Sequence, residues 1–136
     1  MTTLNFPLVL CIDDETLGLK VRKTVLERAG YEVLTAENGS HGLELFAHHP
    51  VQVVVLDYGM PDMHGGEVAA LMRQTKPDVP IVLLSAYVDL APDVISMVDV
   101  YLTKGMGAPA LLDSLSGLLS AKSRGGANPS TMVASA

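Results

Sequence analysis

Three carboxylates follow apolar runs of this sequence at the point where each run ends. Asp57 closes the run Val-Val-Val-Leu at 53–56, and Asp13 and Asp14 follow the run at 8–12. Carboxylates held close together repel one another, and the repulsion favours protonation unless a cation lies between them. If the three meet in the folded chain, they form a site for a hard divalent cation with oxygen ligands, and Mg²⁺ fits such ligands well.

A hydroxyl group and an ammonium group follow two later apolar runs. Ser85 comes directly after residues 80–84, and Lys104 lies just beyond residues 100–102. A metal ion and a lysine can neutralise phosphoryl oxygens, and a hydroxyl can donate a hydrogen bond to them. These residue types therefore indicate phosphoryl transfer with a carboxylate as acceptor. Asp57 is the predicted acceptor because it is central among them, and its attack on a phosphoryl group gives an acyl phosphate.

Five apolar runs that predict buried strands alternate with segments of helical period. The strands are predicted at residues 8–12, 31–36, 51–56, 80–84 and 100–102. The first helix has an apolar residue at every fourth position and ends at Gly30, and the last has a broad leucine stripe. Shorter helices are predicted around residues 43–47, 68–72 and 93–98. The stripes are formed by Leu17, Val21, Val25 and Ala29 in the first helix and by Leu111, Leu112, Leu115, Leu118 and Leu119 in the last.

This alternation predicts an α/β fold in which a doubly wound, five-stranded parallel sheet is covered by helices on both faces. In the flavodoxin-like strand order 2-1-3-4-5, the first and third strands are neighbours, and ligands bind beyond the carboxyl ends of the strands. Asp13, Asp14 and Asp57 are therefore expected to converge on one edge of the sheet, with Ser85 and Lys104 beside them.

Length and composition place this site in a single domain. The chain has 136 residues, of which 49% are hydrophobic, and we assign residues 1–120 to the domain and residues 121–136 to a flexible tail or linker stub. The lone Cys11 in an apolar run, the missing charged leader and the short apolar runs favour the cytoplasm and exclude membrane insertion. A net charge of −6 argues against direct binding of nucleic acid.

With these motifs in order, the chain resembles the response-regulator receiver domains of two-component signalling, in particular the stand-alone chemotaxis-type receiver. The resemblance covers about residues 8–119. Its motifs are Asp13-Asp14, "LDYGMPDMHGGE" at 56–67, Ser85-Ala86 and "VYLTKG" at 100–105.

The resemblance implies a role for each matching residue. Asp57 would accept a phosphoryl group from a histidine kinase or a histidine phosphotransfer protein, and Ser85 and Lys104 would bind that group. Ser85 and Tyr101 would form the switch that responds to phosphorylation. Mg²⁺ would be the cofactor, with the side chains of Asp13, Asp14 and Asp57 and the backbone carbonyl of Gly59 as its ligands.

The chain also departs from the family pattern. Gly105 stands where the family has a proline after the lysine, so the loop loses that constraint. The stretch between Ser85 and Tyr101 is short for the family, which predicts a truncated helix on the face that carries the output signal. Gly59 and Tyr87 occupy the two positions that flank the route of the hydrolytic water in the family.

The sequence leaves three functions open. The first is a phosphorylation-switched interaction module, which is not an enzyme in the usual sense, although it could take phosphate from small donors and lose it by autodephosphorylation. The second is a pseudo-receiver that binds its partners without phosphate. The third is a Mg²⁺-dependent aspartyl phosphatase of the haloacid dehalogenase type, which Gly59 disfavours because that family has a second Asp there.

Overall fold

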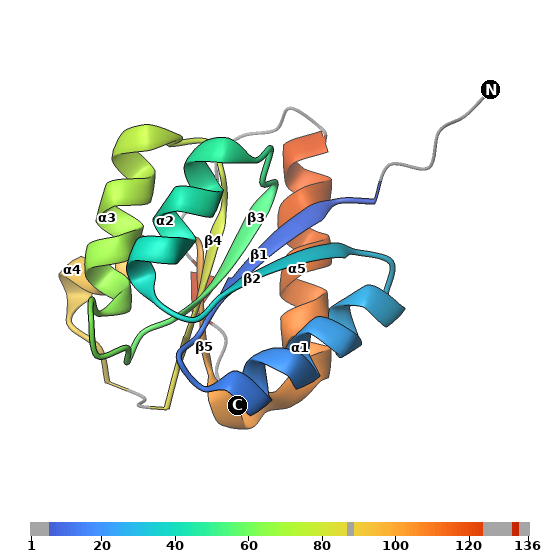
Figure 1. The fold of residues 1–136 in the computed structure, drawn as a ribbon, viewed down its shortest axis with the longest axis horizontal. Coiled ribbons are helices and arrows are strands. Elements are labelled where there is room, and N and C mark those ends of the chain that lie inside the picture. Colours follow the sequence, from blue (N-terminus) through green and yellow to red (C-terminus); the bar gives the residue numbers. More distant parts are fainter. Residues whose placement is uncertain (1–5, 87–88, 124–131, 134–136) are drawn as a thin grey trace.

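A computed structural model describes residues 6–86, 89–123 and 132–133. Its centre is a parallel sheet in the order β2-β1-β3-β4-β5-β6, so the predicted order of the first five strands is confirmed (Figure 1). The sixth strand is a two-residue addition that the apolar pattern does not predict. The strands are β1 (Leu8–Ile12), β2 (Glu32–Ala36), β3 (Val53–Asp57), β4 (Ile81–Ser85), β5 (Val100–Thr103) and β6 (Met132–Val133).

Five α-helices cover the two faces of the sheet. In Figure 1, α1 and α5 lie on one side, and α2, α3 and α4 lie on the other. Each of the first four crossovers returns the chain to a parallel strand, as parallel pairing requires. The helices are α1 (Thr16–Arg28), α2 (Gly39–His48), α3 (Gly65–Thr75), α4 (Pro92–Ile95) and α5 (Gly107–Ser123), with a short 3₁₀ helix at Lys104–Met106.

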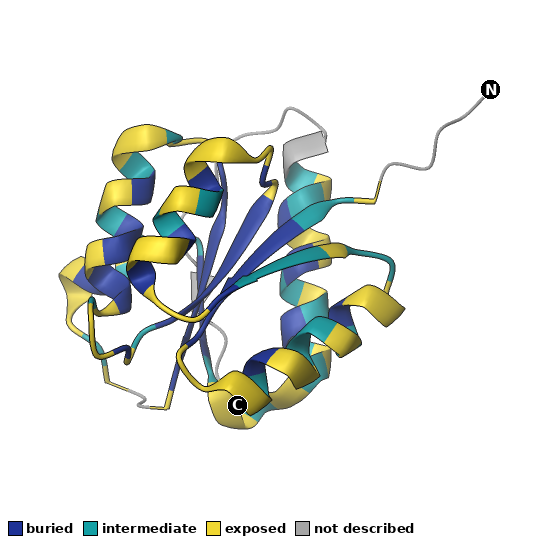
Figure 2. Cartoon of the chain, in the orientation of Figure 1, coloured by how far each residue is buried: buried dark blue, intermediate teal, exposed yellow. Residues whose placement is uncertain are grey.

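The strands build two separate cores because successive side chains point to opposite faces. In β3, Val53 and Val55 pack with leucines of α1 and α5, whereas Val54 and Leu56 pack with the core under α2, α3 and α4. All five residues of β3 and all five of β4 are buried (Figure 2). These two strands are therefore enclosed by packed side chains up to their carboxyl ends.

The inward face of α1 differs from the predicted one. Leu17 and Val21 are 74% and 56% exposed, while Leu19 and Leu26 are buried. The spacing of four residues predicts the helix correctly. However, the side chains that face the sheet are Leu19 and Leu26, and Leu17 and Val21 of the predicted stripe lie at the surface.

Helix α4 has only four residues, which confirms the predicted truncation. The segment that follows it is held by Arg73 of α3. The Arg73 side chain donates to the carbonyl oxygens of Met97, Pro77 and Val79 and forms an ion pair with Asp99. Asp99 also accepts from the backbone N–H of Ile81 at 2.7 Å. This network ties the segment between α4 and β5 to α3 and to the start of β4.

The predicted tail begins inside α5, which ends at Ser123. Met132–Val133 of that tail form β6, which pairs in parallel with β5. The other residues beyond Ser123 lie outside the described ranges, and the domain boundary at residue 120 stays a prediction. Among the residues that are described, no helix is both long and apolar enough to cross a membrane.

Candidate functional site

The predicted acidic cluster forms at the carboxyl edge of the sheet. Strand β1 pairs with β3 so that Ile12 lies opposite Leu56. Asp13 directly follows β1, and Asp57 is the last residue of β3. Carboxylate oxygens of Asp13, Asp14 and Asp57 lie within 4.8 Å of one another. Asp13 is fully buried and Asp57 is 4% exposed, whereas Asp14 is open to solvent. Two of the three charges are therefore shielded from water.

Lys104 brings a positive charge to these carboxylates from β5, two strands away from β3. The residue begins the 3₁₀ helix that leads into α5. Its Nζ lies 3.0 Å from Oδ1 of Asp57 and 3.4 Å from Oδ2 of Asp13. The side chain is 32% exposed, so the ammonium group sits at the rim of the site, in contact with both the buried acids and the solvent.

The protonation equilibria of the site are shifted in different directions. Burial, the strongest influence on Asp57, together with the neighbouring charge of Asp13 raises the pKa of Asp57 despite the opposing effect of Lys104. Burial also acts on Asp13, but a hydrogen bond from the backbone N–H of Glu15 and the charges of Lys104 and Arg22 together hold its pKa below the ordinary value. Of the two acids, Asp13 therefore keeps its negative charge to the lower pH.

The chemistry of this donor set fits Mg²⁺. Three carboxylates converge on one point, and hard oxygen ligands are those that Mg²⁺ prefers. Asp13, Asp14 and Asp57 would hold the ion through their side chains. Gly59 is exposed in the loop after β3, and its carbonyl remains a predicted further ligand.

Ser85 and Tyr101 lie toward the face of the sheet that α2, α3 and α4 cover. Ser85 ends β4 and is 1% exposed, and Tyr101 of β5 is 3% exposed. The alternation of side chains places Ser85 on the face of Ile81 and Leu83, which pack in the same core as Tyr101. Both predicted switch residues are therefore buried on the α4 side, and their roles stay predictions.

The loop after β3 is fixed by a close backbone approach at Gly65. The N–H of Gly65 donates to the carbonyl of Tyr58 at 2.7 Å, and a Cβ on Gly65 would lie 2.8 Å from Cα of Tyr58 and 2.9 Å from the Asp57 carbonyl oxygen. Only glycine allows this approach. Asp62 in the same loop accepts from the N–H groups of Gly39 and Ser40, which joins the loop to α2.

Arg22 is a residue of the site that the sequence motifs do not predict. Its Nη1 lies 3.2 Å from Oδ2 of Asp13, and its side chain is 15% exposed. A sign of it is present in the sequence, because Leu19, Arg22 and Leu26 form an inward stripe with a charged residue at its centre. The stripe of Leu17 and Val21 obscures it.

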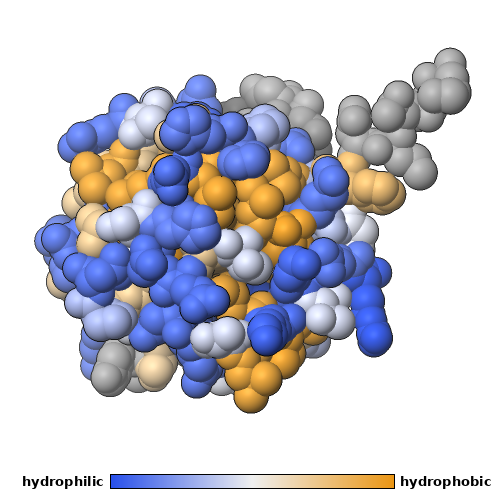
Figure 3. Space-filling view, viewed as in Figure 1, coloured by the Kyte–Doolittle hydropathy of each residue, from blue (hydrophilic) through white to orange (hydrophobic). Residues whose placement is uncertain are grey.

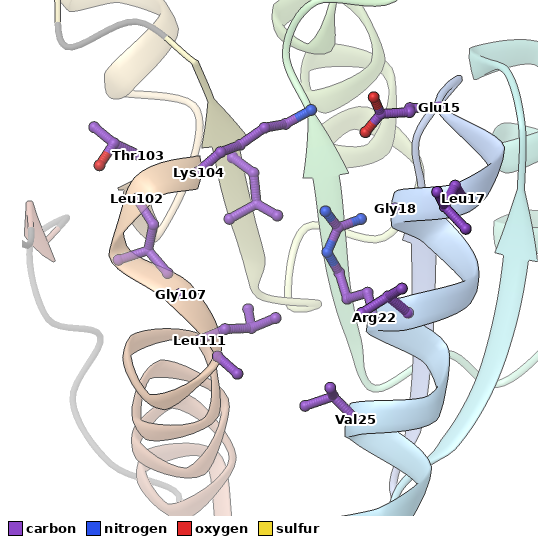
Figure 4. A pocket seen from close by; sticks show the side chains of 13 residues that line it. Glu15, Leu17, Gly18, Arg22, Val25, Leu102, Thr103, Lys104, Gly107 and Leu111 are labelled. Carbon is purple, nitrogen blue, oxygen red and sulfur yellow. The ribbon is translucent and has the colours of Figure 1, made fainter.

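A groove opens between α1 and α5 beside the acidic cluster. Its volume is about 420 Å³, and its walls include Leu17, Val21 and Val25 on one side and Leu111 on the other. Lys104 and Arg22 extend from opposite walls toward the end of β3 (Figure 4). Figure 3 shows apolar side chains at the surface near the start of α1. Tyr87, a predicted flank of the site, lies outside the described residues.

Comparisons with known proteins identify relatives of this arrangement. A family model described as the response regulator receiver domain matches residues 9–116. The transcriptional regulatory protein KdpE of Mycobacterium tuberculosis is 39% identical over 111 residues, which cover 79% of this chain and 49% of KdpE. The chain thus spans about half the length of this curated relative.

Solved structures agree with the fold. A CheY-like receiver domain from Methanospirillum hungatei superposes with a TM-score of 0.84 at 26% identity, covering 90% of this chain and 100% of that one. The response regulator TrrA of Thermotoga maritima, solved with Mg²⁺ and BeF, has a TM-score of 0.77 at 34% identity and covers 83% and 99%. TrrA has also been solved in complex with the histidine kinase ThkA.

Proposed function

The chain belongs to the response regulator receiver domains of two-component signalling, and from this membership we propose that it is switched by transfer of a phosphoryl group to Asp57. The observation that supports the choice of Asp57 most strongly is its contact with Lys104 at 3.0 Å, inside a cluster of three converging carboxylates. Asp57 is the member of that cluster that ends the central strand of the sheet.

In the proposed transfer, a carboxylate oxygen of Asp57 attacks the phosphorus of a phosphohistidine. The P–N bond to the imidazole breaks, its electron pair leaves with the imidazole, and an acyl phosphate forms on Asp57. Lys104 holds one phosphoryl oxygen by charge, and Ser85 donates a hydrogen bond to another. Mg²⁺, when bound to the carboxylates, would neutralise further charge on the phosphoryl oxygens.

The simplest test uses a small donor, because it needs no partner protein. Incubation of the chain with acetyl phosphate and Mg²⁺ should add one phosphoryl group, seen in the intact mass, and an excess of EDTA should suppress the addition. Slow loss of the group after the donor is removed would show autodephosphorylation. Absence of any addition over a wide range of donor and Mg²⁺ concentrations would speak for a pseudo-receiver instead.

We propose that the protein donor lies over the groove between α1 and α5. A phosphohistidine must come within bonding distance of Asp57, so its protein has to rest on the rim beside Lys104. Leu17 and Val21 are the large exposed apolar side chains of this wall. A helix of a histidine kinase, with an apolar stripe of its own, fits such a surface. TrrA, 34% identical, forms a complex with a histidine kinase.

The double variant Leu17→Ala/Val21→Ala should slow phosphorylation by a histidine kinase about 10-fold or more, since both anchors of the wall are lost. Its rate with acetyl phosphate should stay at the wild-type value, because a small donor does not use the wall. The kinase for this test is chosen by screening purified, autophosphorylated histidine kinases for the one that phosphorylates the wild-type chain fastest. Leu71→Ala is the matched control, since Leu71 is an exposed apolar residue of α3. Equal slowing with both donors would place the defect at the site and not at the wall.

The signal is proposed to pass from Ser85 to Tyr101 and the short α4 segment. Lys104→Met should still permit phosphorylation but should remove most of the spectral change that phosphorylation causes in residues of β5 and α4, measured by ¹H–¹⁵N correlation spectra. The reason is that Lys104 would no longer draw the phosphoryl group toward β5. Lys20→Met on α1, an exposed lysine, serves as control. A wild-type response in Lys104→Met would show that the lysine has no part in the switch.

A further inference from the structure

The buried carboxylate Asp13 receives two cations from two different elements. Nη1 of Arg22 lies 3.2 Å and Nζ of Lys104 lies 3.4 Å from the same oxygen, Oδ2. The other oxygen, Oδ1, accepts from the backbone N–H of Glu15 at 2.9 Å. Both oxygens of Asp13 thus have partners within the protein.

Arg22 reaches this acid because both side chains lie in the layer between the sheet and α1. Val9 and Cys11, at alternate positions before Asp13, pack in the core of the α1 and α5 face. Arg22 stands between Leu19 and Leu26 on the inward face of α1. Figure 4 shows its guanidinium group directed along the groove toward the strand ends, on the opposite wall from Lys104.

The position of Arg22 has a specific consequence for a cation. The oxygen that it contacts belongs to a carboxylate of the three-acid cluster. A divalent ion bound there would stand beside a guanidinium group that is 15% exposed, where water screens the repulsion only partly. To bind Asp13 through Oδ2, the ion would have to displace Arg22 or share the oxygen with it.

We propose that Arg22 is an internal counter-ion that holds Asp13 in the metal-free protein, competes with Mg²⁺ for it, and so sets the Mg²⁺ affinity of the receiver. The inference rests on the proposed function, because it assumes that Mg²⁺ binds at the three carboxylates. It assigns Arg22 a positioning role and no part in the transfer itself. Mg²⁺ binding and release of the arginine would then be one coupled event.

The test is the Mg²⁺ dissociation constant of Arg22→Gln, measured by isothermal titration calorimetry at fixed ionic strength. Removal of the competing charge should tighten binding about 5-fold or more. Arg22→Lys should remain close to wild type, since it keeps the charge. Lys23→Gln is the matched control: it removes one positive charge from the neighbouring position of α1, where Lys23 pairs with Glu27 at 3.3 Å and is 42% exposed. It should change the constant by less than about 2-fold.

Thermal unfolding gives a second readout that does not depend on transfer. Without Mg²⁺, Arg22→Gln should have a lower thermal midpoint than wild type, because the buried carboxylate loses a partner. The rise in midpoint on addition of Mg²⁺ should be larger in the variant than in wild type, since the ion binds the folded state more tightly. Lys23→Gln should show the wild-type rise.

A third readout uses the unaltered protein. The side-chain Nε–Hε signal of Arg22 in ¹H–¹⁵N spectra should shift or broaden as Mg²⁺ is added, and this arm decides the question if Arg22→Gln does not fold. An unchanged or weaker affinity in Arg22→Gln, or a stationary Arg22 signal at saturating Mg²⁺, would overturn the inference. Failure of wild type to bind Mg²⁺ at all would instead overturn the proposed metal site.

Discussion

Asp57→Asn should fail to take up a phosphoryl group from acetyl phosphate under conditions in which wild type is fully labelled. The amide has almost the same shape as the carboxylate but no anionic oxygen to attack phosphorus, and no other carboxylate of the cluster ends a central strand. We expect a loss of at least about 100-fold in rate, or ~2.8 kcal/mol at ~1.4 kcal/mol per tenfold. Intact mass over time measures it.

Asp62→Asn is the matched control for this variant. Asp62 lies five positions later in the loop after β3, and its carboxylate accepts from the N–H groups of Gly39 and Ser40, a role that the amide oxygen can keep. Asp62→Asn should therefore be labelled at nearly the wild-type rate. Equal labelling of Asp57→Asn and wild type would mean that another residue is the acceptor.

Loss of either flanking acid should weaken Mg²⁺ binding about 10-fold or more, because a hard-ion site depends on the number and charge of its ligands. Asp14→Ala suits this test since Asp14 is exposed. Asp13 is better replaced by Asn, since alanine would strip both Arg22 and Lys104 of a buried partner. The dissociation constant is measured by calorimetry.

Asp113→Ala gives the charge control for these two variants. Asp113 is an exposed acid of α5 and does not belong to the cluster. Its loss changes the net charge by the same amount and should leave the Mg²⁺ constant within about 2-fold of wild type. If Asp13→Asn and Asp14→Ala bind Mg²⁺ as tightly as Asp113→Ala, the three carboxylates are not the metal site.

The meeting of the site residues at the strand ends was predictable from two regularities. Unbroken apolar runs predict buried parallel strands, and the strand order then brings their carboxyl ends to one edge. Asp13, Asp57 and Lys104 meet for this reason, and their predicted convergence is confirmed. The short α4 was predictable from the number of residues between β4 and β5.

The faces of α1 were not predictable in the same way. The stripe that contains Leu17 and Val21 is more apolar than the stripe that faces the sheet, because the inward stripe has Arg22 at its centre. A charged residue is placed inward only where a buried partner exists, and Asp13 becomes that partner only in the folded chain. A rule that places every charged residue at the surface therefore predicts the buried face of α1 as exposed and the exposed face as buried.

Strand β6 lies beyond the same rules. Two residues, Met132 and Val133, carry no period and stand in a stretch of small and polar residues. Their pairing with Val100 and Tyr101 uses backbone hydrogen bonds at the free edge of β5, which a sequence pattern does not record.

The position of the phosphoryl group tests the account most directly. Sodium borohydride reduces an aspartyl phosphate to homoserine, so treatment of the labelled protein and sequencing of its tryptic peptides by tandem mass spectrometry locates the acceptor. Asp57 falls in a different peptide from Asp13 and Asp14, since Lys20 and Arg28 lie between them. Homoserine at position 57 alone is the predicted result, and homoserine at position 13 or 14, or at none of the three, would contradict it.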